Sequence, residues 1–143
     1  MNAKAPAAAD AALDRDVEVA ARTLYGEARG QPLEGIVAVA NVIVNRWRRG
    51  GYGATPADVC LRPWQFSCWN ARDPNRAVIE RVRPGDFVFD VCRLVASLAV
   101  RGLLPDPTGG ATHYHTRSVA PDWSRGKTPS AVIGDHLFFT DID

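Results

Sequence analysis

One glutamate of this chain stands where an acid could do chemistry. Glu27 lies in the run Tyr25-Gly26-Glu27-Ala28-Arg29-Gly30, between two stretches whose apolar residues recur with helical spacing. A carboxyl group that is enclosed by apolar side chains can act as a proton donor near neutral pH. The alternative is a carboxylate that only ends a helix, and the local sequence leaves both open. The remaining glutamates occupy surface-like positions of predicted helices: Glu18, Glu34 and Glu80.

A pair of histidines offers a different chemistry. The run 111–116 alternates with a period of two, which predicts a strand with His113 and His115 on one face and Tyr114 on the other. Alternate strand residues can share a zinc ion, so a zinc-dependent peptidase is an alternative to acid catalysis. A lone His-x-His without a His-Glu-x-x-His helix is weak evidence, and we expect neither a metal nor another cofactor.

The three cysteines point to no site of their own. Cys60, Cys68 and Cys92 are odd in number and lack metal-site spacing, which excludes a dense disulfide framework. Buried thiols are expected, and a Cys60–Cys68 bridge stays open. None of them sits at a predicted helix start beside a positive group, which disfavours a thiol nucleophile.

An aromatic and polar stretch follows in residues 63–70, Pro-Trp-Gln-Phe-Ser-Cys-Trp-Asn. Indole rings stack on sugar faces and amides bond hydroxyl groups, so this stretch suits a carbohydrate groove. A folded loop whose aromatic rings cap the core is the other interpretation, and the residues alone do not separate the two.

Two helices must position Glu27. Asp10 is the expected cap of the first, whose apolar stripe leads directly to Glu27; Gly26 and Gly30 place this residue in the last turn or just past it. The second helix runs from Pro32 to the glycine pair at Gly50 and is apolar on two sides, which predicts a central position. Its amides, Asn41 and Asn45, either line a polar cavity or bond neighbouring backbone.

The rest of the chain supplies packing elements. A short helix is predicted near Pro56–Leu61 with Thr55 as its cap. A third helix opens at Asp73 and stops at Pro84-Gly85, and Asp86 caps a fourth that ends at Gly102. The period-two strand at 111–116 and a closing hairpin within residues 131–139 come last. The predicted fold class is therefore α+β, a single domain that is mostly helical with a small antiparallel β part near the C-terminus.

Length and composition set further limits. The chain has 143 residues, 46% hydrophobic and 23% charged, with a net charge of +1, which fits one domain over residues 10–143 after a flexible leader at 1–9. Near-neutral charge argues against nucleic acid as a partner, and Arg46, Arg48 and Arg49 are interpreted as a solvated helix face. No stretch approaches the roughly 20 apolar residues of a membrane span. A monomer is the default expectation.

Five runs together resemble the bacterial cell wall hydrolase family that includes the spore cortex-lytic enzymes. They follow in order over nearly the whole chain: Leu24–Gly30, Gly35–Ala40 with Val44-Asn45-Arg46, Gln65-Phe66-Ser67, Gly109–Tyr114 and Ile133–Phe138. The resemblance implies a lysozyme-like fold that cleaves the β-1,4 bond between N-acetylmuramic acid and N-acetylglucosamine. Its partner would be the glycan strands of peptidoglycan.

The resemblance also assigns roles by position. Glu27 matches the catalytic glutamate, Tyr114 an aromatic beside the acid, and Gln65 and Ser67 a segment lining the cleft. Asn45 matches a polar helix position and is grouped with the substrate-binding residues. His115 joins that group, although the family carries an Asn-Pro stretch where this chain reads His-Thr-Arg-Ser at 115–118.

The expected reaction depends on a second carboxylate, which glycosidases place across the sugar ring. The nearest candidates, Asp58 and Asp122, look like cap or loop residues. Their positions favour the route of lytic transglycosylases, in which the muramic 6-hydroxyl attacks and leaves a 1,6-anhydro end. Because the first ten residues lack the apolar core of a signal peptide, synthesis in the cytoplasm and action on the cell wall after release are expected, as for a phage endolysin or a particle-associated lysozyme. A non-catalytic peptidoglycan-binding or phage structural module is the alternative outside the enzymes.

Overall fold

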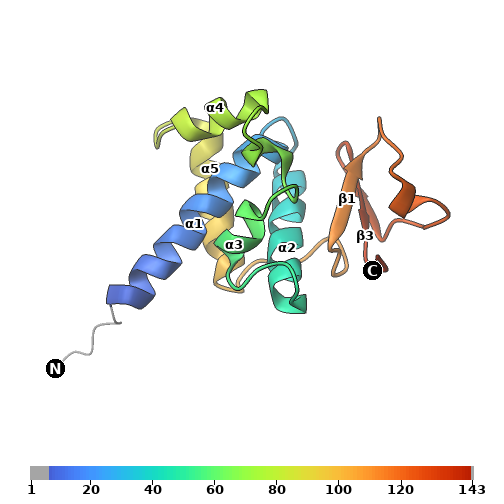
Figure 1. Ribbon diagram of the computed structural model, residues 1–143, viewed down its shortest axis with the longest axis horizontal. Coiled ribbons are helices and arrows are strands. Elements are labelled where there is room, and N and C mark those ends of the chain that lie inside the picture. Colours follow the sequence, from blue (N-terminus) through green and yellow to red (C-terminus); the bar gives the residue numbers. More distant parts are fainter. Residues whose placement is uncertain (1–6, 143) are drawn as a thin grey trace.

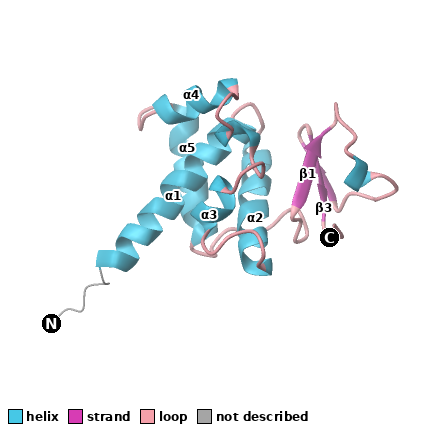
Figure 2. Ribbon diagram, viewed as in Figure 1, coloured by secondary structure: helices cyan, strands magenta, loops and turns pink. Residues whose placement is uncertain are grey.

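Five helices gather on one side of the molecule and three strands on the other in the computed structural model, which describes residues 7–142 (Figures 1 and 2). The helices are α1 (Ala7–Ala28), α2 (Leu33–Arg49), α3 (Pro56–Leu61), α4 (Pro74–Arg81) and α5 (Phe87–Val100). The strands are β1 (His113–Thr116), β2 (Ala131–Ile133) and β3 (His136–Phe139). Two short 3-10 turns, η1 (Ser67–Trp69) and η2 (Asp122–Ser124), complete the elements. The prediction of a mostly helical α+β fold with a small antiparallel β part is confirmed.

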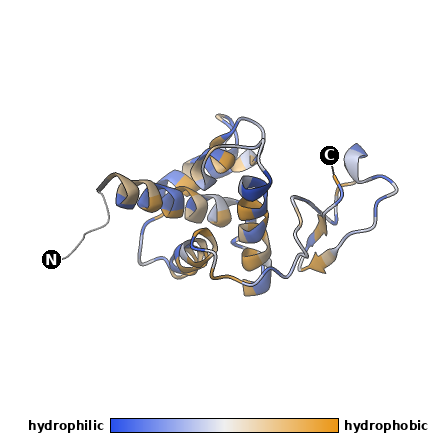
Figure 3. Cartoon of the chain, turned by 90° about the horizontal axis from the view of Figure 1, so that it is seen from below, coloured by the Kyte–Doolittle hydropathy of each residue, from blue (hydrophilic) through white to orange (hydrophobic). Residues whose placement is uncertain are grey.

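The helix α2 is central, as its two apolar sides predicted. It packs against α1, α3, α5 and β2, and most of its residues between Gly35 and Arg46 are buried. Pro32 precedes its first turn, and Gly50 ends it with φ 85°, a left-handed conformation that glycine adopts without strain. Coloured by hydropathy, the helices carry apolar residues beside polar ones, as amphipathic helices do (Figure 3).

The first helix begins earlier than predicted. It starts at Ala7, three residues before the expected cap Asp10, because alanine has the highest helix propensity and the run 7–9 is alanine only. The other residues of the predicted leader, 1–6, lie outside the described part of the chain. Glu27 falls in the last turn of α1, as predicted.

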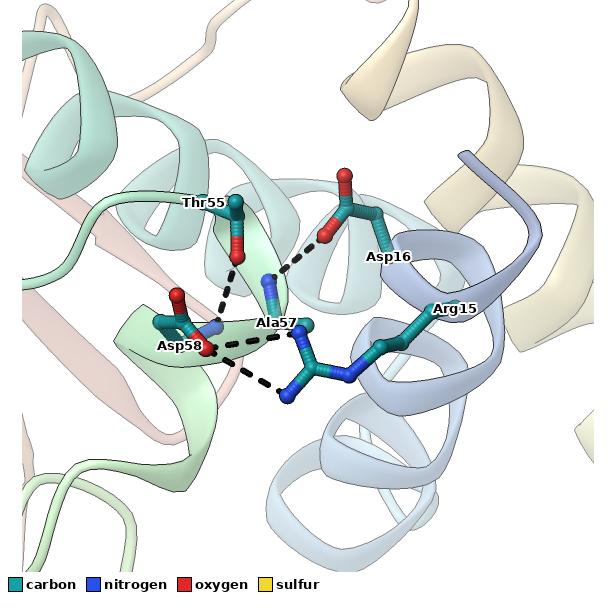
Figure 4. A network of polar contacts seen from close by, with 5 residues as sticks. All are labelled: Arg15, Asp16, Thr55, Ala57 and Asp58. Carbon is teal, nitrogen blue, oxygen red and sulfur yellow. Dashed lines mark hydrogen bonds and ion pairs between the residues drawn. The ribbon is translucent and has the colours of Figure 1, made fainter. Parts of the chain in front are cut away.

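Side-chain caps begin α3, α4 and α5 as expected. Thr55 accepts a hydrogen bond from the Asp58 N–H, Asp73 from Asn75 and Asp86 from Phe89. The start of α3 is also tied to α1, because Asp16 accepts from the Ala57 N–H and Arg15 pairs with Asp58 at 3.3 Å (Figure 4).

The sheet has the order β1-β3-β2, with both pairs antiparallel. Tyr114 of β1 lies opposite Phe138 of β3, and β2 and β3 form the predicted hairpin. Between residues 7 and 142, no helix combines the length and the apolar character that crossing a membrane requires.

All three cysteines are buried free thiols, so the bridge between Cys60 and Cys68 does not form. Burial raises the pKa of Cys60 and of Cys92 to about 12, and it also raises the pKa of Cys68. Thiols that keep their protons are poor nucleophiles.

Candidate active site

The position of Glu27 depends on the glycine before it. A Cβ atom at Gly26 would lie 2.7 Å from the Cβ of Cys68 and 2.9 Å from Cγ2 of Ile79. Only a residue without a side chain lets the end of α1 pack this closely against η1 and α4. Arg29 then holds the turn, donating to the Tyr25 carbonyl and to the Asn75 side-chain oxygen.

Tyr114 joins the sheet to the end of α1. Its hydroxyl donates a hydrogen bond to Oε1 of Glu27 over 2.5 Å, across 87 residues of sequence. Burial, and then the negative charge of Glu27, raise the pKa of Tyr114 well above its ordinary value. The hydroxyl therefore stays protonated and remains a donor to the carboxylate. The ring packs against His136 and Phe138 of β3, which fixes its direction.

A buried arginine, Arg46, carries a positive charge that interacts with Glu27 and Tyr114. Arg46 is 6% exposed; its Nε donates to the Thr112 carbonyl over 2.6 Å, and its guanidinium lies over the rings of Phe66 and Tyr52. Burial lowers the pKa of Arg46, and the opposing effects of Tyr114, Tyr52 and Glu27 offset only part of this shift. Because the guanidinium pKa starts above 12, the group keeps its positive charge.

The interpretation of Arg46 as part of a solvated face is wrong. It lies three, four and seven residues after Ile43, Val42 and Val39, which are all buried, and helical geometry places residues with these spacings on one face. That spacing was the available signal, and the neighbouring arginines obscured it. Arg48 and Arg49 are exposed as predicted.

The loop between α3 and α4 divides its aromatic residues between core and surface. Phe66 and Cys68 are buried, and Trp69 donates its indole N–H to the Thr23 hydroxyl over 2.8 Å. Gln65 accepts from Arg46 at 3.4 Å, and Ser67 is exposed. The predicted groove segment thus reaches the Glu27 site through Gln65 and through Cys68, whose pKa is raised by burial and then by the negative charge of Glu27.

The two amides of α2 hold the chain that leads into β1. Asn45 donates to the Asp106 carboxylate and to the Ala111 carbonyl, each over 2.9 Å, so its two amide hydrogens are engaged inside the protein. Asn41 donates to the carbonyls of Val37 and Pro105. Substrate binding by Asn45 stays a prediction, with only its oxygen left for it.

The Asp106 carboxylate is the centre of this loop. Burial acts to raise its pKa, but hydrogen bonds from Thr108, Asn45 and Gly110 outweigh burial and hold the pKa below its ordinary value. A carboxylate held in this way stays charged and anchors the turn before β1.

The histidines occupy the other face of β1. His113 and His115 both contact Trp123, with ring centroids 5.2 and 5.6 Å apart, and His115 stacks on Phe139. Nδ1 of His113 lies 3.0 Å from the Thr112 hydroxyl, and Nδ1 of His115 lies 2.7 Å from the Thr116 carbonyl. Within residues 7–142, no three His, Cys, Asp or Glu side chains group to hold a metal ion. Substrate binding by His115 stays a prediction, on the face away from Tyr114.

The two acids that the sequence named as partners for Glu27 lie elsewhere. Asp58 pairs with Arg15 on α1, twelve residues before Glu27, which is about 18 Å along a helix. Asp122 has a side chain that is 94% exposed and pairs with Arg125. Asp58 is therefore too far along α1 to work across a sugar ring from Glu27, and the Asp122 carboxylate is engaged by Arg125 at the surface.

Comparison with known proteins assigns the chain to a family. Residues 30–139 match the family described as Cell Wall Hydrolase. The chain belongs to the cell wall hydrolase family. The match begins three residues after Glu27 and includes Arg46, Gln65 and Tyr114. The predicted resemblance is therefore confirmed over most of the chain.

Curated relatives of this hydrolase are spore cortex-lytic enzymes. That of Halalkalibacterium halodurans is 32% identical over 131 residues, covering 87% of this chain and 34% of the relative. That of Bacillus subtilis is 30% identical over 126 residues, covering 87% of this chain and 37% of the relative. The chain thus spans about a third of the length of these relatives.

Solved structures agree with the fold. The catalytic domain of the Bacillus cereus SleB protein superposes with a TM-score of 0.70 at 28% identity, over 87% of this chain and 89% of that domain. The catalytic domain of the germination-specific lytic transglycosylase SleB from Bacillus anthracis gives 0.68 at 29% identity, over 87% and 93%. This hydrolase therefore has the fold of a SleB catalytic domain.

Proposed function

We propose that this cell wall hydrolase cleaves the β-1,4 bond between N-acetylmuramic acid and N-acetylglucosamine, with Glu27 as general acid and base. The observation that carries the proposal is the contact between Glu27 and the buried, protonated hydroxyl of Tyr114, in front of the buried Arg46 charge. An acid that is held by a donor and lies at the seam between helices and sheet suits proton transfer to a glycosidic oxygen.

The relatives support the same substrate. Those at about a third identity are named spore cortex-lytic enzymes, and one matching structure is named a lytic transglycosylase. Both names describe proteins that break down a cell wall polymer. We extend that substrate class to this chain as part of the proposal.

The proposed reaction moves one proton out of Glu27 and one back. Protonated Glu27 gives its proton to the glycosidic oxygen, and the bond from that oxygen to the muramic anomeric carbon breaks. The carboxylate then takes the proton of the muramic 6-hydroxyl as its oxygen bonds to the same carbon, which closes a 1,6-anhydro ring. The Tyr114 hydroxyl stabilises the carboxylate between the two steps. The ion pairs of Asp58 with Arg15 and of Asp122 with Arg125 engage both candidate partner acids, which supports this route over attack by water.

Mass spectrometry of digested peptidoglycan tests the proposal. The wild type should release fragments with anhydro-muramic ends, and Glu27→Gln should lower the rate by about 10²- to 10⁴-fold while the protein stays folded. The matched control is Glu34→Gln, because Glu34 is exposed in the first turn of α2. Fragments with reducing ends and no anhydro ring would show that water attacks the anomeric carbon, and would contradict the intramolecular route.

The same digest separates the alternatives. Cleaved stem peptides with intact glycan strands, lost on chelation and restored by zinc, would favour a peptidase that uses His113 and His115. A binding module would retain its affinity and its biological effect in Glu27→Gln. The setting as a phage endolysin or a particle-associated lysozyme that meets the wall after release is also part of the proposal, and a holin or tail gene beside its own would support it.

A further inference from the structure

One tryptophan of the α3–α4 loop is exposed in a strained conformation. Trp64 has a φ of 67°, in the left-handed region that residues other than glycine rarely adopt. Among residues 7–142 it is the only non-glycine residue with a positive φ. Its side chain is 82% exposed, so no packing in the core compensates for the strain. Strain of this kind concentrates at functional sites.

A hollow of about 380 Å³ lies beside this ring. Trp64 lines one side, and Asn70, Ala71, Arg72 and Asp73 line the other. No hydrogen bond joins the Asn70 amide or the Arg72 guanidinium to another group in the part of the chain that the structure describes, whereas Asp73 uses one oxygen to cap α4. A flat apolar ring with free amide, guanidinium and carboxylate oxygen around a hollow matches a sugar, which has an apolar face and a rim of hydroxyl and acetamido groups.

Both sides of the hollow are tied to the residues around Glu27. Gln65, next to Trp64, accepts a hydrogen bond from Arg46. On the other side, Asn75 follows the Asp73 cap and accepts from Arg29, two residues after Glu27. The loop that carries the hollow passes the end of α1 through η1, which contacts both α1 and α4 (Figure 1).

We propose that this hollow is a remote sugar subsite that holds an N-acetylhexosamine ring of the glycan strand, stacked on the indole of Trp64. The inference rests on the proposed function, because a polymer cleaved at Glu27 continues on either side of the cleaved bond. Binding energy from a ring far from the reacting bond improves capture of long strands and leaves short fragments unaffected.

Binding to peptide-free glycan strands tests the subsite directly. In the Glu27→Gln background, which should not consume the ligand, Trp64→Gly should weaken binding of long strands by about tenfold, the stacking contribution of one ring. Glycine adopts φ 67° without strain, so this variant should melt no lower than its parent. Trp64→Phe should retain part of the affinity. The matched control is Phe87→Ala, since Phe87 is an equally exposed aromatic, 80%, at the start of α5.

Cleavage by the otherwise wild-type enzyme gives the second measurement. Trp64→Gly should lower kcat/KM for long strands by about tenfold and leave a short fragment that ends at the cleavage site unchanged. Equal rates for Trp64→Gly and wild type on long strands would overturn the subsite while leaving Glu27 in its role. An effect that disappears when stem peptides are removed would assign the hollow to peptide and overturn the sugar. Failure of the proposed function is distinct, because the wild type itself would then release no glycan fragments.

Discussion

The two faces of β1 carry the two chemistries that the sequence offered, acid catalysis at Glu27 and a histidine pair that could share a zinc ion. On one face Tyr114 is buried and donates to Glu27, which comes from a helix 87 residues earlier. On the other face His113 and His115 pack against Trp123, and His115 also stacks on Phe139. A strand therefore separates the acid site from the histidine pair by alternation alone.

The difference between the faces lies in what each polar group meets. The Tyr114 hydroxyl donates to the Glu27 carboxylate, and the positive charge of the buried Arg46 acts on it as well. The histidine rings meet Trp123 and Phe139, and their Nδ1 atoms lie within hydrogen-bond distance of the adjacent residues Thr112 and Thr116. Convergence of groups from α1, α2, η1 and β1 marks the first face as the place for catalysis.

Removing the tyrosine hydroxyl is the strongest test of this asymmetry. Tyr114→Phe keeps the ring packing but deprives the Glu27 carboxylate of its donor, so activity on peptidoglycan should fall by about 10- to 100-fold, the contribution of a hydrogen bond to a charged group. His115→Gln should cost less than about threefold. Turnover measured on the same peptidoglycan preparation compares the two, and an equal loss in both variants would end the distinction between the faces.

The second-largest effect is expected from a methyl group added beside Glu27. Gly26→Ala should lower the free energy of unfolding by about 1–3 kcal/mol, because its Cβ would overlap the buried side chains of Cys68 and Ile79. Helix propensity alone would give the opposite sign. Gly30→Ala is the control, since a Cβ there meets nothing within 4 Å. Urea denaturation measures both, and a Gly26→Ala protein as stable as the wild type would show that the α1 end is loosely packed.

The smallest expected effect belongs to the histidine face. Burial, helped by Arg46 and Arg49, lowers the pKa of His113 to about 4 from its ordinary 6.5. The unfolded chain therefore binds a proton between these values that the folded protein does not. The free energy of unfolding should fall as the pH drops from 6.5 towards 4, by less than about 1 kcal/mol because the ring is partly in solvent.

Comparison with His113→Asn over that pH range isolates this contribution. The variant should show a flatter pH dependence of the denaturation midpoint. A wild-type profile that rises towards low pH would contradict the sign.

Local signals were sufficient for the helices. Pro32 and Gly50 bracket α2, and the predicted caps Thr55, Asp73 and Asp86 precede the first residues of α3, α4 and α5 in the structure. These residues act within one turn of their own position, so neighbouring sequence contains the physics. The early start of α1 at Ala7 shows the limit, since propensity outweighed the expected cap.

Long-range contacts had no such signal. Nothing in residues 113–116 tells that β1 pairs with β3, twenty residues on, rather than with β2. Tyr114 was placed beside the acid through the family resemblance alone. Arg46 was missed, although its spacing from buried Val39 and Val42 predicted an inward position. The core-cap interpretation of residues 63–70 describes Trp69, which bonds Thr23, whereas Trp64 faces solvent and the sugar groove stays a prediction.

The bond between Glu27 and Tyr114 also has a consequence for the order of synthesis. Glu27 leaves the ribosome before the strand that carries Tyr114, and that strand is held by β3, at His136–Phe139, which is made later still. A nascent or truncated chain that ends before β3 can contain every helix and still lack the partner that holds the acid. Assembly of the site therefore has to wait for the synthesis of β3.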